Sequence, residues 1–253
     1  MITLRTRPHS GIFGPMVTSN PLLKRSESFS GTAETAMSLN GTVNKTGILL
    51  LICMATAYYG WITPELRGGL LAVPLLGGCV LAMVGMFKPA TSPYVAPLYA
   101  ALEGLVLGVI SEMFNVRYPG IAVNAVLLTF SVLGLFLFLY ATRIVRVTSG
   151  MRVAIIAATG GICLVYIIDM VLGFFGHSVP FINSSGPLGI GVSIFICGIA
   201  AFNFFLDFDA IEGFIRSGSP KYMEWYSGLA LLITLVWLYL EILRLLSKLQ
   251  SRR

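Results

Sequence analysis

The stretch GPLGIGVSIFICGIAAFNFFLDFDAIE (residues 186–212) decides the fold, because it is an apolar run long enough to cross a bilayer as a helix. A transmembrane helix needs about 20 predominantly apolar residues to span a hydrocarbon core of about 30 Å. Only the end of this stretch is charged, with the carboxylates of Asp207, Asp209 and Glu212 close together. The stretch therefore predicts a membrane-spanning helix that ends in acids.

The composition of the whole chain indicates the same environment. Of 253 residues, 56% are hydrophobic and 11% are charged, whereas a soluble domain has about 25% charged residues. The connections between apolar stretches are short and leave no room for a soluble catalytic domain. Lipid requires every backbone polar group to be satisfied internally, which favours a compact helical bundle. The sequence predicts an all-α polytopic protein whose seven transmembrane helices cover residues 46–62, 69–87, 93–114, 120–141, 152–176, 186–209 and 224–247.

The first 45 residues differ from the rest of the chain. They are rich in Ser, Thr, Gly and Asn and poor in apolar side chains, so we expect a disordered N-terminal arm over 1–45 and one membrane domain over 46–253. The arm lacks the apolar core of a secretory signal, which leaves the first membrane helix as the expected targeting signal. The cysteines lie in apolar stretches without CxxC spacing, and this favours packing over disulfides or a bound metal.

The basic residues predict the orientation of the chain. The side that carries the N-terminus holds most of them: Lys24, Arg25, Lys45, Lys88, Arg143, Arg146, Arg152, Arg216 and Lys221. The opposite loops hold Arg67 and Arg117, so we expect a cytoplasmic N-terminus. Seven crossings would then leave the basic tail with Lys248, Arg252 and Arg253 outside, which conflicts with the same rule. A re-entrant segment, with six crossings and a cytoplasmic tail, is the alternative. The net charge of +6 is loop charge that suits lipid headgroups and predicts no nucleic-acid partner.

Ionisable residues inside the apolar stretches are the candidate functional residues, because a carboxylate at the bilayer centre costs about 2.5–3.5 kcal/mol. Glu103 lies in the middle of the helix 93–114, and Asp169 lies in the second half of the helix 152–176. Asp207 lies near the end of the helix 186–209. Each of these acids has a structural alternative, namely a hydrogen bond to a neighbouring helix or a position near the interface.

Helical spacing places Asp207 on an inward face. This face continues through small and polar residues at intervals of three and four, which are Gly189, Ser193, Ile196, Ala200 and Asn203. Small residues allow close approach of helices, and polar ones hydrogen-bond across the contact. Asp209 and Glu212 share a different face, on which interfacial solvation is the simplest role.

The last helix, 224–247, also carries polar residues. Thr234 and Glu241 lie one above the other, about two turns apart. Glu241 and Arg244 are three residues apart, so we expect a local ion pair between them.

Four segments together resemble the bacterial branch of the Bax inhibitor-1 family, the YccA-like membrane proteins. They are SPYVAPLYAALEGLVLGVISEMF (92–114), YPGIAVNAVLLTF (118–130), the stretch 186–212 quoted above, and GSPKYMEWYSGLALLITLVWLYLEILRLLSKL (218–249). The resemblance implies a seven-helix fold with helix seven in the centre, and a bacterial inner-membrane location. It also implies a proton-sensitive calcium leak, in which an aspartate of helix six and one of helix seven share protons and gate the pore. The LDFDAI segment places the first of these at Asp207.

One departure from the family pattern concerns the second aspartate. Aligning LDFDAI and LYLEILRLL places Thr234 at its position, and a threonine cannot share a charge with Asp207. In a carboxylate pair the two protons leave in coupled steps. Glu103 or Glu241 could supply the missing carboxylate from another part of the bundle.

Three functions follow as hypotheses. The first is a pH-sensitive calcium or cation leak channel, gated by Asp207 with Glu103 as a second acid, and with Asn203, Thr234, Asp209, Glu241 and Asp169 as accessory residues. Asp207 would be a transient calcium ligand, since oxygen ligands suit a hard cation, and no permanent metal or cofactor is expected. The second is a membrane-embedded regulator that binds another membrane protein, such as a quality-control protease. An enzyme is disfavoured, because HExxH and GxSxG motifs are absent and both histidines lie outside the apolar stretches.

Overall fold

The computed structural model of the protein describes residues 36–177, 179, 182 and 184–252, and these form an all-α bundle. Within this part of the chain, seven helices are long and apolar enough to cross a membrane. Their bounds are α2 Leu39–Ile62, α3 Ala72–Phe87, α4 Ser92–Arg117, α5 Ile121–Ala141, α6 Ser149–Phe174, α8 Pro187–Arg216 and α9 Met223–Gln250. Short 3-10 turns precede α3 and α4. The chain is therefore a multi-pass membrane protein, as its composition predicts.

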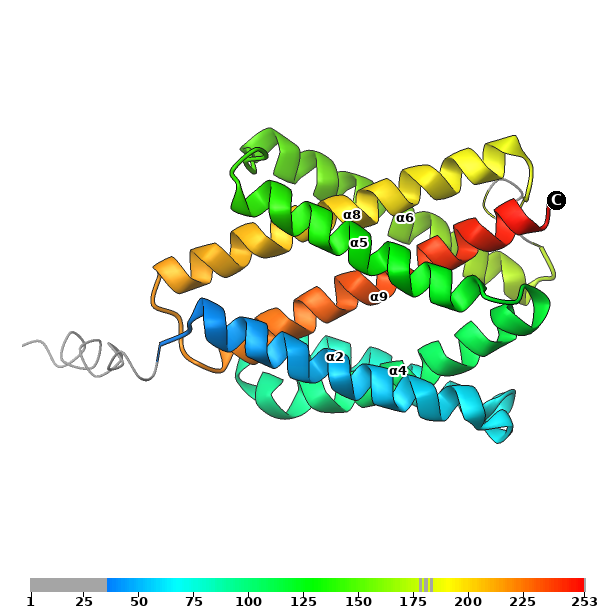
Figure 1. Cartoon of the computed structure of the whole chain (residues 1–253), viewed down its shortest axis with the longest axis horizontal. Helices are drawn as coiled ribbons and strands as arrows, with labels where there is room; N and C mark the ends of the chain where they lie inside the picture. Colours follow the sequence, from blue (N-terminus) through cyan, green and yellow to red (C-terminus); the bar gives the residue numbers. More distant parts are fainter. Residues whose placement is uncertain (1–35, 178, 180–181, 183, 253) are drawn as a thin grey trace, which may run out of the picture.

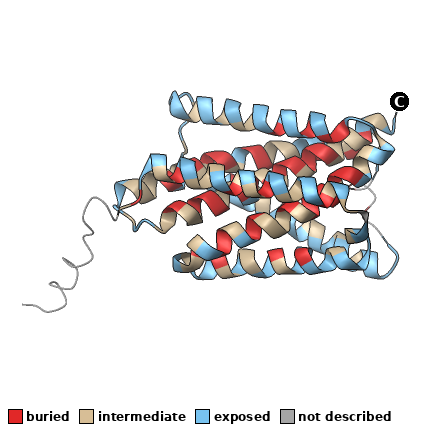
Figure 2. Ribbon diagram, turned by 60° about the horizontal axis from the view of Figure 1, so that its bottom comes forward, coloured by how far each residue is buried: buried red, intermediate tan, exposed pale blue. Residues whose placement is uncertain are grey.

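The helices run up and down, and α9 passes through the middle of the bundle (Figure 1). It packs against α2, α4, α5 and α8. Buried residues gather on the inner faces of the helices, while the outer faces are exposed (Figure 2). Among the described spans, α4 and α9 have the largest buried share and α6 the smallest. The central place expected for the last helix is confirmed, and α6 is left at the periphery.

The tightest contact in the bundle joins α2 to α4 through glycines. A Cβ on Gly104 would meet the backbone of Cys53, and one on Gly108 would meet the carbonyl oxygen of Ala57. On the other helix, a Cβ on Gly60 would meet the carbonyl oxygen of Leu105. Small residues spaced by four allow two helix backbones to touch, which gives van der Waals contact that lipid cannot match.

The helix α2 begins at Leu39, earlier than the residue 46 expected from hydropathy. Ser38 caps it, with its Oγ accepting a hydrogen bond from Gly41 N. The cap is in turn held by Glu224 at the start of α9, whose Oε1 accepts from Ser38 N and Ser38 Oγ at 3.1 Å each. Just before it, Met37 N donates to Ser219 O in the α8–α9 connection. Residues 36–45 are thus part of the bundle, whereas the rest of the expected arm, 1–35, lies outside the described residues.

The last two helices form an antiparallel hairpin. The helix α8 extends to Arg216 rather than residue 209, so the three acids of its end are all helical. The helix α9 is continuous from Met223 to Gln250, with no break of the kind that a re-entrant segment requires. The two ends of the described chain consequently lie at opposite ends of the bundle (Figure 1).

Candidate functional site: a polar row between α6, α8 and α9

Asp207 of α8 faces α9, where Thr234 donates a hydrogen bond from Oγ1 to Asp207 Oδ2 at 2.7 Å. Thr234 is buried, and Asp207 is half-buried. The resemblance implies a second aspartate at the position of Thr234, and the structure brings this position into direct contact with Asp207. The contact joins one acid to a neutral donor and contains no second charge.

One turn before Asp207, Asn203 uses the same face of α8. Its Nδ2 donates to Thr159 Oγ1 of α6 at 2.9 Å and to Ile199 O within α8 at 2.8 Å. The rest of the face is buried as the spacing predicts, at Ala200, Ile196, Ser193 and Gly189. Asn203 therefore joins α8 to α6, beside the contact that joins α8 to α9.

Glu241 of α9 is 2% exposed and lies in a second polar contact, this time with α6. Tyr166 donates from its hydroxyl to Glu241 Oε1 at 2.7 Å, and Arg244 Nη1 donates to the Tyr166 oxygen at 2.5 Å. The expected pair of Glu241 and Arg244 is present at 3.3 Å. The Arg244 guanidinium also lies over the Tyr166 ring. The sequence did not predict the part played by Tyr166, whose hydroxyl connects this ion pair to α6.

At the far end of α9, Lys248 is a buried cation with 6% exposure. Its Nζ donates to Ile182 O at 2.5 Å, to Ser193 Oγ at 2.8 Å and to Gly189 O at 3.1 Å. We expected Lys248 in the basic tail, and this was wrong, because it lies within α9 and is buried. Its aliphatic stem runs inward, and the ammonium is satisfied by oxygens of α8 and of the segment that precedes it.

These contacts form a row along the α8–α9 hairpin, with α6 at its side. We call it the polar row, and its residues are Asp207, Thr234, Asn203, Thr159, Glu241, Tyr166, Arg244, Ser193 and Lys248. Thr234, Glu241 and Lys248 recur every seven residues on α9. At about 1.5 Å per residue, the row extends over about 21 Å, which is most of the thickness of a hydrocarbon core.

The other acids near the end of α8 lie outside the polar row in cross-helix ion pairs. Asp209 accepts from Arg152 of α6 at 2.5 Å. Glu212 accepts from Arg143 Nη2 and from the Tyr140 hydroxyl, both at 2.6 Å. We expected these carboxylates to be solvated at the interface; both side chains are partly exposed, and each also pairs with an arginine from the helix or loop beside α8.

The structure does not bring the remaining candidate acids to Asp207. Glu103 of α4 is half-buried against α3, where a Cβ on Gly78 would lie 3.3 Å from its Oε2. Asp169 Oδ1 accepts from Val179 N at 2.8 Å, so this acid holds the connection that follows α6. Of the two carboxylates that could have completed a pair with Asp207, Glu103 faces α3 and Glu241 is held by Tyr166 and Arg244.

The polar row contains residues that sequence reasoning did not single out, namely Thr159, Tyr166 and Lys248. The seven-residue recurrence on α9 is a signal that could have identified Lys248. Nothing in the sequence of α6 distinguishes Thr159 or Tyr166 from packing residues, because their role depends on which helix lies beside them. In the described part of the chain, no group of three or more His, Cys, Asp or Glu side chains could hold a metal ion.

Comparison with known proteins supports the resemblance at the level of the family. A family model described as "Bax inhibitor 1 like" matches residues 20–251. The comparisons with curated proteins and with solved structures gave no match.

Proposed function

Because the chain belongs to the Bax inhibitor 1 like family, we propose that it is a pH-sensitive leak channel for cations, calcium foremost, with the Asp207 carboxylate as its gate. The observation that carries the proposal is the polar row. Ionisable groups between transmembrane helices are costly, and where they occur they mark ion pathways, proton relays or switches. Asp207 stands at one end of this row, where its charge decides whether a cation is attracted.

The proposed gate is a single acid. Thr234 donates to Asp207 and adds no titrating group, so the conductance should change in one step with pH. Glu103 stays a candidate second acid only for a separate site, since it faces α3. Asp207 would contact calcium transiently during passage, because one carboxylate supplies far fewer oxygens than the 6–8 of a resident calcium site.

The opposite end of the row is closed by Lys248 in this proposal. Its ammonium occupies the oxygens of Ile182, Gly189 and Ser193, the kind of ligands that a passing cation would use. A fixed positive charge at this point opposes a divalent cation that approaches from that end. The structure is consistent with a closed channel in which Asp207 and Lys248 are the two barriers.

The described residues also support the proposed orientation. Basic side chains cluster at the ends of helices on the side of the N-terminus, at Lys88, Arg143, Arg146, Arg216 and Lys221. Burial of Lys248 removes one of the tail cations that conflicted with seven crossings. We therefore keep a cytoplasmic N-terminus. A bacterial inner membrane and a non-enzymatic role are further parts of the proposal, and they rest on the resemblance and on the absence of catalytic motifs.

The test is calcium flux into vesicles that contain the purified protein, between about pH 5 and pH 8. Asp207→Asn resembles the protonated acid in shape, so it should hold flux at the low-pH level throughout. Thr234→Asp places two carboxyl groups at hydrogen-bond distance and should give two coupled steps. Glu65→Gln changes an exposed acid outside the row and serves as the matched control. An unchanged pH response in Asp207→Asn would make this residue a structural hydrogen-bond partner only.

The alternative function is a regulator that binds another membrane protein without ion flux of its own. The observation in its favour is α6, whose outer surface is the most exposed among the described spans and could receive a partner helix. Vesicles that show no protein-dependent flux at any pH would favour this alternative over the channel.

A further inference from the structure

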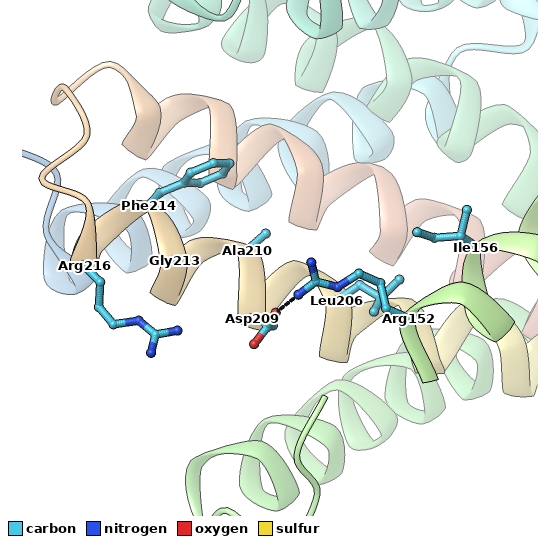
Figure 3. Close-up of a pocket in the computed structure, with 8 residues that line it drawn as sticks. All are labelled: Arg152, Ile156, Leu206, Asp209, Ala210, Gly213, Phe214 and Arg216. Atoms are coloured by element: carbon cyan, nitrogen blue, oxygen red, sulfur yellow. Dashed lines mark hydrogen bonds and ion pairs between the residues drawn. The ribbon is translucent and has the colours of Figure 1, made fainter. Parts of the chain in front are cut away.

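A cavity of about 500 Å³ lies between α6 and α8 at the end of the bundle that carries the N-terminus. Figure 3 shows Arg152 reaching from α6 to Asp209 on α8, with Arg216 farther along the same helix. The cavity is separate from the polar row, because Asp209 and Asp207 point to different sides of α8.

The charged residues of the cavity are not balanced. Arg152 is paired with Asp209, and both side chains are partly exposed. Arg216 is exposed and has no ion pair among the residues that the structure describes, although Glu212 lies on the preceding turn in a pair with Arg143. Two guanidinium groups and one carboxylate therefore leave one positive charge at the cavity.

The cavity changes from polar to apolar with depth. Arg216 ends α8, and Arg152 lies in the first turn of α6. The Arg152–Asp209 pair lies seven residues, about 10 Å, deeper along α8 than Arg216. One turn beyond Arg152 and Asp209, Ile156 and Leu206 line the cavity, and Ile156 is 57% exposed. A charged rim above an apolar wall matches the order of chemical groups along a phospholipid, from its phosphate to its acyl chain.

We propose that this cavity binds an anionic glycerophospholipid of the leaflet on the N-terminal side. Arg216 contacts the phosphate, and the Arg152 guanidinium, which Asp209 holds about 10 Å deeper along α8, faces the glycerol ester groups. One acyl chain lies along Ile156 and Leu206. Guanidinium groups bind phosphate oxygens in a bidentate geometry, and basic residues near an anionic leaflet each strengthen binding about fivefold.

The test uses the full-length protein in detergent, titrated with dioleoylphosphatidylglycerol or dioleoylphosphatidylcholine and observed by native mass spectrometry. We expect preferential retention of the anionic lipid. Arg216→Gln should weaken that retention about fivefold and leave the Arg152–Asp209 pair in place. Arg252→Gln, which removes an exposed arginine at the other end of the bundle, is the matched control and should have no effect.

A second variant tests the apolar part of the site. Leu206→Trp should fill the cavity and reduce lipid retention without removing a charge. Inorganic phosphate at the same concentration should not compete, because it lacks an acyl chain. Equal retention of the two lipids, unchanged retention in Arg216→Gln, or displacement by inorganic phosphate would each overturn the proposal. None of these results depends on ion flux.

Discussion

The contact between Glu224 and the start of α2 predicts a measurable stability cost for a residue far from the polar row. Glu224 is 1% exposed, and its Oε1 accepts two hydrogen bonds from Ser38. Hydrogen bonds to a charged group contribute about 1.5–3 kcal/mol each in soluble proteins, and about 0.6 kcal/mol is the mean between membrane helices. Because this contact lies at a helix end, we expect Glu224→Ala to lower the free energy of unfolding by about 3 kcal/mol.

Matched variants separate the parts of that cost. Glu224→Gln keeps an acceptor and loses the charge near the helix N-terminus, so about 1 kcal/mol should be lost. Ser38→Ala removes the cap and should also cost about 1 kcal/mol. The double variant of Ser38→Ala and Glu224→Ala should be less destabilised than the sum of the single changes by about 1 kcal/mol. Glu65→Ala, an exposed acid elsewhere, should leave stability unchanged.

The assay is reversible unfolding in mixed detergent micelles, followed by circular dichroism. A backbone variant provides an independent check, because a Cβ on Gly41 would collide with the Glu224 carboxylate, whereas one on Gly47 would meet nothing within 4 Å. Gly41→Ala should therefore destabilise the protein and Gly47→Ala should not. If Glu224→Ala unfolds at the same denaturant concentration as Glu65→Ala, the reasoning from burial and hydrogen bonding is refuted.

Two further predictions use the same unfolding assay. Gly108→Ala should lower the free energy of unfolding by about 2–3 kcal/mol, because its Cβ would meet the α2 backbone at Ala57. Gly134→Ala is the control, since its Cβ would face open space, and this change should be neutral or stabilising. Equal effects of the two changes would contradict the close packing of α2 and α4. Lys248→Met should cost about 2–4 kcal/mol and increase hydrogen exchange of the amides of residues 189–193, since it removes a charged donor from three oxygens. Unchanged exchange there would mean that Lys248 does not hold the start of α8.

Much of the fold could be predicted because hydropathy and helix length set the spans. The positions at which α8 ends and α2 begins could not be predicted, since the residues there are polar and are held by partners distant in sequence. The inward face of α8 was predictable from the spacing of its small and polar residues. The partners of Asp209 and Lys248 were not, because they depend on how α6, α8 and α9 are shifted along one another. A basic residue near a chain end has the same sequence pattern whether its stem points to water or into the bundle.

The bond between Ser38 and Glu224 joins residues 186 positions apart and so bears on the order in which the protein is made. Synthesis proceeds from the N-terminus, and domains form as their segments emerge. The first transmembrane helix therefore enters the membrane long before the carboxylate that holds its Ser38 cap exists. The glycine contact of α2 with α4 can form early. The contact of the first turn of α2 with Glu224 can form only after the beginning of α9 has been made. The hydrogen bonds of Ser38 with Glu224 are therefore among the last contacts of the bundle to form, because they require α9 to be inserted.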